Sequence, residues 1–161
     1  MTTSAAPPRF RDFSHITVRV SALERALTFY RDGLGLRVIF DVRLDGAGLD
    51  AVTGTPGSRG RMVGLVVPGA GRVCIELLGF EHPASEPPPR GRFTGYSNIS
   101  LSVDDLDAAY AACVARGLRP LQKPVEVGGV KMFFLADPDG TAIELIQFPR
   151  GATTSAAFNG V

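Results

Sequence analysis

The sequence lacks the features that mark several large classes of protein. Its 17 Lys and Arg residues nearly balance 16 Asp and Glu residues, which leaves a formal net charge of only +1. A balance of this kind is not typical of proteins that bind nucleic acid or acidic membrane surfaces. No stretch is apolar over the length needed to span a bilayer, and residues 1–12 lack the apolar core of a signal peptide. We therefore expect a cytoplasmic protein with no nucleic-acid partner and no membrane partner.

Cysteine is also scarce. Cys74 and Cys113 fall in a predicted strand and a predicted helix, without the spacing of a cysteine metal site, so we expect buried free thiols. The length of 161 residues suffices for one compact domain or for two small modules that pack together.

The sequence does contain an internal duplication, in which one structural unit occurs twice. Residues 13–27 align without a gap on residues 96–110, and residues 73–80 match residues 141–148. In each copy a strand of alternating polar and apolar residues, 15–20 or 98–103, precedes a helix with apolar residues at helical spacing. Two copies of one unit can enclose a shared cavity, and repeated polar residues should face it.

Local signals give the limits of the elements. Ser21 and Glu24 form the pattern of a capping box, and Gly33 should end the first helix; Asp104 should cap the second helix and Gly117 should end it. Three further strands are predicted in each copy, at 36–43, 62–67 and 72–79 and then at 119–126, 131–136 and 141–148. Each unit therefore has the order β-α-β-β-β, which predicts an α+β fold.

This order divides the chain into two modules, at residues 12–80 and 96–148. A proline-rich linker, 81–95, joins them, and tails at 1–11 and 149–161 flank them. The first module carries additional glycine-rich residues within 44–61, which predict either a mobile loop or lid or an ordinary surface insertion.

Four polar residues occupy repeated positions on strands. His15 is equivalent to Asn98, and Glu76 is equivalent to Glu144. Both glutamates lie in otherwise apolar strands, where burying a carboxylate is unfavourable unless it is paired, protonated or bound to a cation. One imidazole nitrogen and two carboxylate oxygens suit a divalent ion such as Zn, Ni, Co, Mn or Fe. We therefore predict that His15, Glu76 and Glu144 converge on one cavity.

Other residues are candidates for binding a substrate. Arg19 shares a strand face with His15 and could hold a carboxylate or phosphate group, or could be solvated at the end of the strand. Ser100 lies on the same face as Asn98. Phe133 and Phe134 alternate faces, so one of them should line the pocket, and Phe133 is the candidate. For His15 the alternative is a structural histidine with satisfied hydrogen bonds.

Together these motifs resemble those of the vicinal oxygen chelate superfamily, which includes glyoxalase I, methylmalonyl-CoA epimerase, extradiol dioxygenases and bleomycin-resistance proteins. The resemblance covers about residues 12–148 and is carried by His15, the sequence FYRDGLGL at 29–36, Glu76, and Asp137-Pro138-Asp139-Gly140 ahead of Ile143-Glu144-Leu145. It implies a curved half-barrel sheet from two βαβββ modules around a shared cavity.

The resemblance also implies a metal site. Members similar to glyoxalase I hold a divalent metal on four residues, which in this chain would be His15, Glu76, Asn98 and Glu144. Asn98 stands where a histidine is usual, and an amide oxygen is a poorer ligand than imidazole for a borderline ion, so metal affinity should be reduced. The dioxygenase pattern needs two histidines and one carboxylate, and this chain has one histidine at a matching position.

For function, the resemblance implies a metal-assisted lyase, isomerase or epimerase acting on a small carbonyl-containing substrate. The metal would stabilise an enolate, Glu144 would transfer the proton, and Glu76 would be a ligand or a second acid or base. A metal-free binding protein of the bleomycin-resistance type and a metal-free isomerase or cyclase of specialised metabolism are the alternatives. Relatives of this kind predict a homodimer.

Overall fold

The computed structural model describes residues 14–69, 74–85, 98–127 and 129–149. The predicted tails, apart from Pro149, and most of the predicted linker therefore lie outside the described residues. The elements of the first module are β1 (His15–Val20), α1 (Leu23–Leu27), the π-helical segment η1 (Thr28–Gly33), β2 (Arg37–Leu44), α2 (Ala47–Thr53), β3 (Arg59–Val66) and β4 (Cys74–His82). Those of the second are β5 (Asn98–Ser102), α3 (Leu106–Ala115), β6 (Val125–Val127), β7 (Val130–Ala136) and β8 (Ala142–Gln147).

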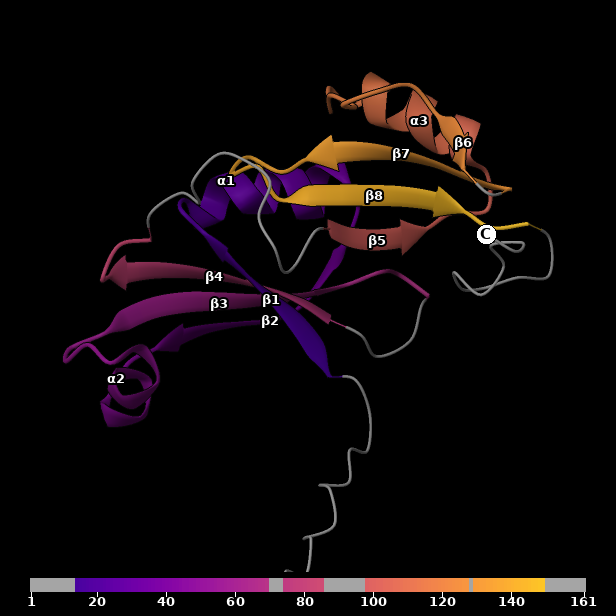
Figure 1. The fold of residues 1–161 in the computed structure, drawn as a ribbon. Coiled ribbons are helices and arrows are strands. Elements are labelled where there is room, and N and C mark those ends of the chain that lie inside the picture. Colours follow the sequence, from indigo (N-terminus) through magenta and orange to yellow (C-terminus); the bar gives the residue numbers. More distant parts are fainter. Residues whose placement is uncertain (1–13, 70–73, 86–97, 128, 150–161) are drawn as a thin grey trace, which may run out of the picture.

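The strands form two four-stranded sheets, one in each module. Their orders are β1-β4-β3-β2 and β5-β8-β7-β6, so the second sheet repeats the topology of the first. In each sheet the first and last strands of the module are parallel neighbours, and the other pairs are antiparallel. Figure 1 shows both sheets curled but not closed. The predicted α+β fold of two βαβββ modules is confirmed.

Alternation along the strands places the main core on one face of each sheet, and a smaller cluster of Val130, Met132 and Ile146 is buried on the other face of the second sheet. In β1 the side chains of Val18 and Val20 are buried, whereas His15, Thr17 and Arg19 on the opposite face are exposed. One apolar cluster continues from the first module into the second, including Leu65 and Leu77 from the first sheet and Leu135 and Ile143 from the second, all fully buried. Burial of a shared apolar surface therefore holds the modules together.

In the view of Figure 1 the helix α1 lies above β4, and it contacts β4. It continues directly into η1, where the backbone N–H of Leu34 donates to the carbonyl of Phe29, five residues back, at 2.9 Å. Such π-type bonds are rare within helices, and the 3.6-residue pattern alone did not predict them. The helical stretch nevertheless ends at Gly33, as predicted.

The predicted capping box is wrong, because both of its residues have partners elsewhere. The residue before α1 is Ala22, and it makes no side-chain cap. The hydroxyl of Ser21 donates to Asp139 Oδ1 at 2.5 Å, and Glu24 accepts from Arg61 Nη1 at 2.5 Å.

In the second helix the cap is shifted by one residue from the prediction. Asp105, not Asp104, caps α3 and accepts from the N–H of Ala108. Gly117 follows the helix with a φ of +77°, which glycine adopts without strain, so the predicted end is confirmed. Cys113 within α3 is buried with a free thiol, and burial raises its pKa. The side chain of Cys74 lies outside the described part of the chain.

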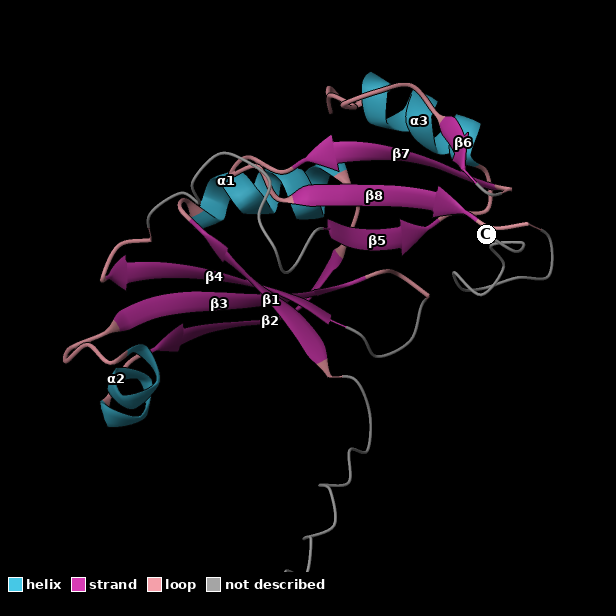
Figure 2. Cartoon of the chain, viewed as in Figure 1, coloured by secondary structure: helices cyan, strands magenta, loops and turns pink. Residues whose placement is uncertain are grey.

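The insertion within 44–61 contains an ordered helix, α2, where the sequence predicted a mobile loop or a surface insertion. Figure 2 shows α2 beyond the ends of β2 and β3. The turn after it is held by Ser58, only 1% exposed, whose hydroxyl donates to the carbonyl of Thr55 at 2.7 Å. Ser58 also pairs with the Thr53 hydroxyl at 2.6 Å, and its N–H donates to Asp50 at 2.8 Å. Hydrogen bonds, rather than an apolar core of its own, therefore stabilise the insertion.

The predicted strand at 119–126 is shortened to β6 at Val125–Val127, preceded by a single bridge between Pro120 and Leu135. Pro120 and Pro124 interrupt the earlier residues, because proline has no N–H to give to a ladder.

The turn between β7 and β8 joins the second module to the first. Asp137, only 4% exposed, accepts the hydroxyl of Tyr30 at 2.9 Å and the N–H groups of Asp139 and Thr141 at 2.9 and 2.8 Å. Asp139 in turn forms an ion pair with Arg25 of α1 at 2.7 Å. This turn therefore has a structural role between modules.

Among the described residues, no helix has both the length and the apolar character that a bilayer crossing requires.

Candidate functional site

Glu76 of β4 is a buried carboxylate on the polar face of the first sheet. Parallel pairing places its Cα opposite that of Thr17 on β1, and the residue is only 8% exposed. The hydroxyl of Thr17 donates to Glu76 Oε2 at 3.3 Å, and His15 Nε2 lies 3.5 Å from the same oxygen. Both contacts are long, so this oxygen is less fully satisfied than buried carboxylates usually are.

His15 begins β1 and is directed by its neighbours. Its Nδ1 lies 2.9 Å from the hydroxyl of Ser14, which leaves Nε2 facing Glu76. The side chain is 43% exposed, whereas that of Glu76 is 11% exposed. The imidazole is therefore reachable from solvent and the carboxylate lies behind it.

Glu144 of β8 occupies the equivalent place in the second sheet. Its Cα lies opposite that of Ser100 on β5, and the residue is 9% exposed. Oε2 accepts from Asn98 Nδ2 at 3.0 Å and from the Ser100 hydroxyl in a short hydrogen bond. Asn98 Nδ2 also contacts the Ser100 hydroxyl oxygen at 2.9 Å. The Asn98 amide, the Ser100 hydroxyl and the Glu144 carboxylate thus contact one another. The contacts of Glu144 are shorter than those of Glu76.

The duplication therefore extends to the hydrogen bonds. In each module the last strand supplies a glutamate, and the first strand supplies a hydroxyl opposite it and a nitrogen two residues earlier. Thr17 is not among the site residues predicted from the sequence. The signal was present, because Thr17 aligns with Ser100, which was named.

Among the described residues, Glu144 contacts neither His15 nor Glu76, so the convergence of these three on one cavity stays a prediction. The structure brings His15 together with Glu76, and Asn98 with Ser100 and Glu144. In the parts of the chain that the structure describes, no group of three or more His, Cys, Asp or Glu side chains is arranged to hold a metal ion. These two groups are half-sites, one in each module.

In each sheet an aromatic residue lies close to the glutamate. Gly64 on β3 lies opposite Glu76, and a Cβ added at Gly64 would overlap the ring of Phe40 from β2. Phe40 therefore covers Gly64 beside the first carboxylate. In the second sheet Phe134 lies opposite Glu144, whereas Phe133 is fully buried in the core. Phe134, not Phe133, shares the face of Glu144.

Arg19 is the remaining predicted contact residue. It is exposed on the face of β1 that carries His15 and Thr17, and its guanidinium carbon lies 4.9 Å from the centre of the Phe80 ring. This cation–π contact holds the arginine along the sheet, with its charge still open to solvent.

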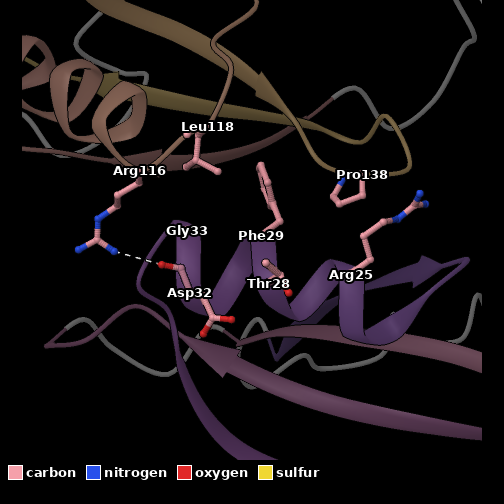
Figure 3. Close-up of a pocket in the computed structure, with 9 residues that line it drawn as sticks. Arg25, Thr28, Phe29, Asp32, Gly33, Arg116, Leu118 and Pro138 are labelled. Atoms are coloured by element: carbon pink, nitrogen blue, oxygen red, sulfur yellow. Dashed lines mark hydrogen bonds between the residues drawn. The ribbon is translucent and has the colours of Figure 1, made fainter.

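A separate groove of about 430 Å³ lies between the modules. Figure 3 shows Phe29 between Leu118 and Pro138, with Arg25 and Arg116 toward opposite ends. Arg116 donates to the backbone carbonyl of Asp32 at 3.1 Å, and Arg25 is paired with Asp139, whose side chain the figure does not draw. These arginines are engaged in joining the modules, and none of the four predicted metal ligands and three predicted substrate contacts lines the groove.

Comparison with known proteins agrees with the duplicated arrangement. Residues 12–145 match the family model of the Glyoxalase/Bleomycin resistance protein/Dioxygenase superfamily. Among solved structures, a glyoxalase family protein from Bacillus cereus has a TM-score of 0.75 at 20% identity, covering 89% of this chain and 98% of its own. That likeness concerns the fold.

Among curated proteins, mitochondrial methylmalonyl-CoA epimerase from Mus musculus is 28% identical over 144 residues, which cover 83% of this chain and 71% of the epimerase. Lactoylglutathione lyase from Haemophilus influenzae is 28% identical over 142 residues, covering 83% of this chain and 90% of the lyase. The repeated topology and the match over most of the sequence lead to one conclusion: the chain belongs to the glyoxalase/bleomycin resistance protein/dioxygenase superfamily, also called the vicinal oxygen chelate superfamily.

Proposed function

We propose that this protein is a metal-assisted lyase, isomerase or epimerase that moves a proton next to a carbonyl group of a small molecule. The observation that carries the proposal is the pair of buried glutamates, Glu76 and Glu144, each beside nitrogen and hydroxyl groups at equivalent places. The names of two relatives, an epimerase and a lyase, agree with this reaction class.

The side chains of the first half-site fit a divalent metal. Zinc ligands lie about 2.0 to 2.2 Å from the ion, so two ligands at a tetrahedral angle lie about 3.3 Å apart. His15 Nε2 and Glu76 Oε2 are 3.5 Å apart, close to that spacing. The contact of Nδ1 with Ser14 leaves Nε2 available, as is usual for a metal-binding histidine. Glu144 and Asn98 are the candidates for the remaining ligand positions.

The metal and the protein side chains would contribute different parts of the reaction. When bound, a divalent metal would make the hydrogen beside a carbonyl more acidic by drawing electron density from the carbonyl oxygen. Glu144 takes this proton as general base and returns it as general acid. Glu76 acts as a ligand, or as a second acid or base on the other side of the substrate. Arg19 contributes a positive charge for an anionic part of the substrate, with Phe134 an apolar neighbour on the Glu144 face.

A complete site requires both half-sites, and among the described residues the side chains of one half-site do not contact those of the other. We propose that two copies form a homodimer in which His15 and Glu76 of one chain meet Asn98 and Glu144 of the other. A mixture of His15→Ala and Glu144→Gln chains tests this arrangement. Random pairing gives half heterodimers, each with one intact site of two, so about a quarter of wild-type activity should return. If each site lies within one chain, mixing restores nothing.

The metal is tested by titrating protein free of metal with Co²⁺. We expect one equivalent per chain to bind, with loss of binding in His15→Ala and in Glu76→Gln. His82→Ala is the control, because His82 is exposed and has no contact with either glutamate among the described residues. Equal binding by wild type and His15→Ala would remove the metal role of this residue.

The reaction is tested by following exchange of substrate hydrogen for deuterium. Methylmalonyl-CoA and lactoylglutathione are the first compounds to try, because the relatives' names contain them. In D₂O with Co²⁺ present, we expect wild-type protein to exchange the hydrogen beside the carbonyl and Glu144→Gln to be at least about 100-fold slower. Absence of exchange with any carbonyl compound that binds would contradict the enzymatic function.

A second function is favoured by Asn98. Its amide donates to Glu144, which satisfies the carboxylate without a cation. The pocket could then sequester a small molecule, as a bleomycin-resistance protein does, or could use Glu76 and Glu144 as a metal-free acid and base in an isomerase or cyclase. Glu144→Gln separates these functions: a sequestering protein keeps most of its ligand affinity, whereas either kind of enzyme loses turnover. The cytoplasmic location belongs with this proposal and stays a prediction.

A further inference from the structure

A hydroxyl group stands beside each buried glutamate, and the two hydroxyls occupy equivalent positions. Thr17 and Glu76 are Cα partners across β1 and β4, and Ser100 and Glu144 are Cα partners across β5 and β8. Each hydroxyl donates to Oε2 of its glutamate. In the described residues neither Oε1 has a hydrogen-bond partner, so one oxygen of each carboxylate is held and the other is open.

The strands direct these hydroxyls at the carboxylates. Side chains of Cα partners on neighbouring strands lie side by side on one face of a sheet, and a β-branched threonine has few rotamers. Ser100 lacks this branching, but its hydroxyl is contacted by Asn98 Nδ2 at 2.9 Å, which fixes it instead. The branched side chain thus restricts the hydroxyl of Thr17 in the first module, and the contact with Asn98 restricts the equivalent hydroxyl of Ser100 in the second.

A held carboxylate has a fixed direction. A glutamate has several rotatable bonds, and contacts at one oxygen restrict it to fewer arrangements, here with the hydroxyl and a nitrogen both at Oε2. In the first half-site the selected oxygen, Oε2, is also the one 3.5 Å from His15 Nε2. Loss of the Thr17 hydroxyl would therefore let this oxygen move away from the imidazole.

We infer that Thr17 and Ser100 are positioning residues, which hold Glu76 and Glu144 in the orientation in which these glutamates act. The role given to the glutamates rests on the proposed function, whereas the positioning itself can be tested without it.

The experiment compares removal of each hydroxyl with its conservative return. Thr17→Val keeps the shape of threonine without the hydroxyl, and Thr17→Ser keeps the hydroxyl. Ser100→Ala and Ser100→Thr form the matching pair. Ser102→Ala is the control, because Ser102 lies on the same face of β5 and its hydroxyl contacts neither glutamate among the described residues.

Two measurements are made on each variant. Crystal structures without metal give the rotamer of each glutamate, and Co²⁺ titration gives the affinity. Thr17→Val and Ser100→Ala should show their glutamate in several rotamers and bind Co²⁺ about 10-fold to 100-fold more weakly, the usual effect of losing a group that orients a ligand. Thr17→Ser, Ser100→Thr and Ser102→Ala should retain the single rotamer and bind Co²⁺ within about threefold of wild type.

The outcomes separate this inference from the function on which it rests. If wild-type protein binds no Co²⁺, the metal function fails, and the rotamers alone decide the positioning role. If Glu76 and Glu144 keep their wild-type rotamers in Thr17→Val and Ser100→Ala, the inference is overturned even where Co²⁺ binds. Weakening by Ser102→Ala equal to that by Ser100→Ala would also overturn it, since the effect would not depend on the hydroxyl beside the glutamate.

Discussion

At the scale of single residues, Tyr30 joins the modules through one buried hydroxyl. The residue is fully buried, and its hydroxyl donates to Asp137 at 2.9 Å. We expect Tyr30→Phe to lower the free energy of unfolding by about 1 to 3 kcal/mol, because a hydrogen bond to a buried carboxylate is lost. Urea denaturation measures the change. Tyr110→Phe is the matched control, since its hydroxyl makes no hydrogen bond in the described part of the chain, and an equal loss there would contradict the prediction.

The candidate site was predictable only to the extent that it is repeated. Glu76 and Glu144 stand out because an acid recurs within an apolar strand, and the structure confirms that both are buried. Which of two adjacent phenylalanines faces Glu144 did not follow from the sequence, since alternation gives two faces without saying which is covered. The metal roles of His15, Asn98 and both glutamates stay predictions.

At the scale of elements, the turn between β7 and β8 makes stability depend on pH. Burial raises the pKa of the Asp139 carboxyl, but hydrogen bonds from Ser21 and Arg25 outweigh burial and hold this pKa below its ordinary value. A lowered pKa in the folded state contributes stability above the unfolded pKa and loses it as pH falls through the folded pKa.

We therefore expect Asp139→Asn to be less stable than wild type near neutral pH and to approach wild-type stability at acid pH. The measurement is urea denaturation at several values from about pH 6 to about pH 3, a range that spans the ordinary pKa of aspartate. Asp45→Asn is the control, because Asp45 is exposed and unpaired among the described residues. A constant difference between wild type and Asp139→Asn at every pH would contradict the prediction.

The helix α2 depends on one serine. Ser58→Ala removes the hydroxyl that contacts Thr53 and Thr55, so the insertion should open more often. We expect hydrogen exchange across 47–53 to become roughly 10-fold faster, while exchange in β1 and β4 stays unchanged. Val52→Ala, at a position 85% exposed, should have little effect. Uniform acceleration across the first module would show that Ser58 supports more than α2.

Elements with strong periodicity were predictable, and elements fixed by tertiary contacts were not. Alternation located β1 and β5, and glycines marked both helix ends. The capping box failed because Ser21 and Glu24 have better partners in Asp139 and Arg61. Helix α2 was missed because it is short, lies in a glycine-rich segment and buries none of its residues, and side-chain hydrogen bonds hold it instead.

At the scale of the whole molecule, the two modules share one core. Leu65 and Leu77 of the first module and Ile143 and Leu135 of the second belong to a single apolar cluster. We expect urea to unfold both modules in one transition, because neither can keep its core when the other is lost. Hydrogen exchange resolved by module measures this. Different midpoints for β4 and β8 would show that the modules unfold independently.

The repeated architecture could be predicted because it recurs in the sequence, whereas the packing of one module on the other could not. Tyr30 and Asp137 are far apart in the sequence, and no local sequence pattern predicts that they contact each other. The dimer stays a prediction for the same reason, since its contacts involve a second molecule.

Joining two modules in one chain has an evolutionary consequence. Two identical copies of a single module must change together, because one gene encodes both and every substitution appears twice. Once fused, each half can diverge independently, as His15 and Asn98 have, while the shared scaffold of a hydroxyl beside an acid is retained. Covalent fusion therefore removes the requirement that the two halves be identical. Each half can then take a different role.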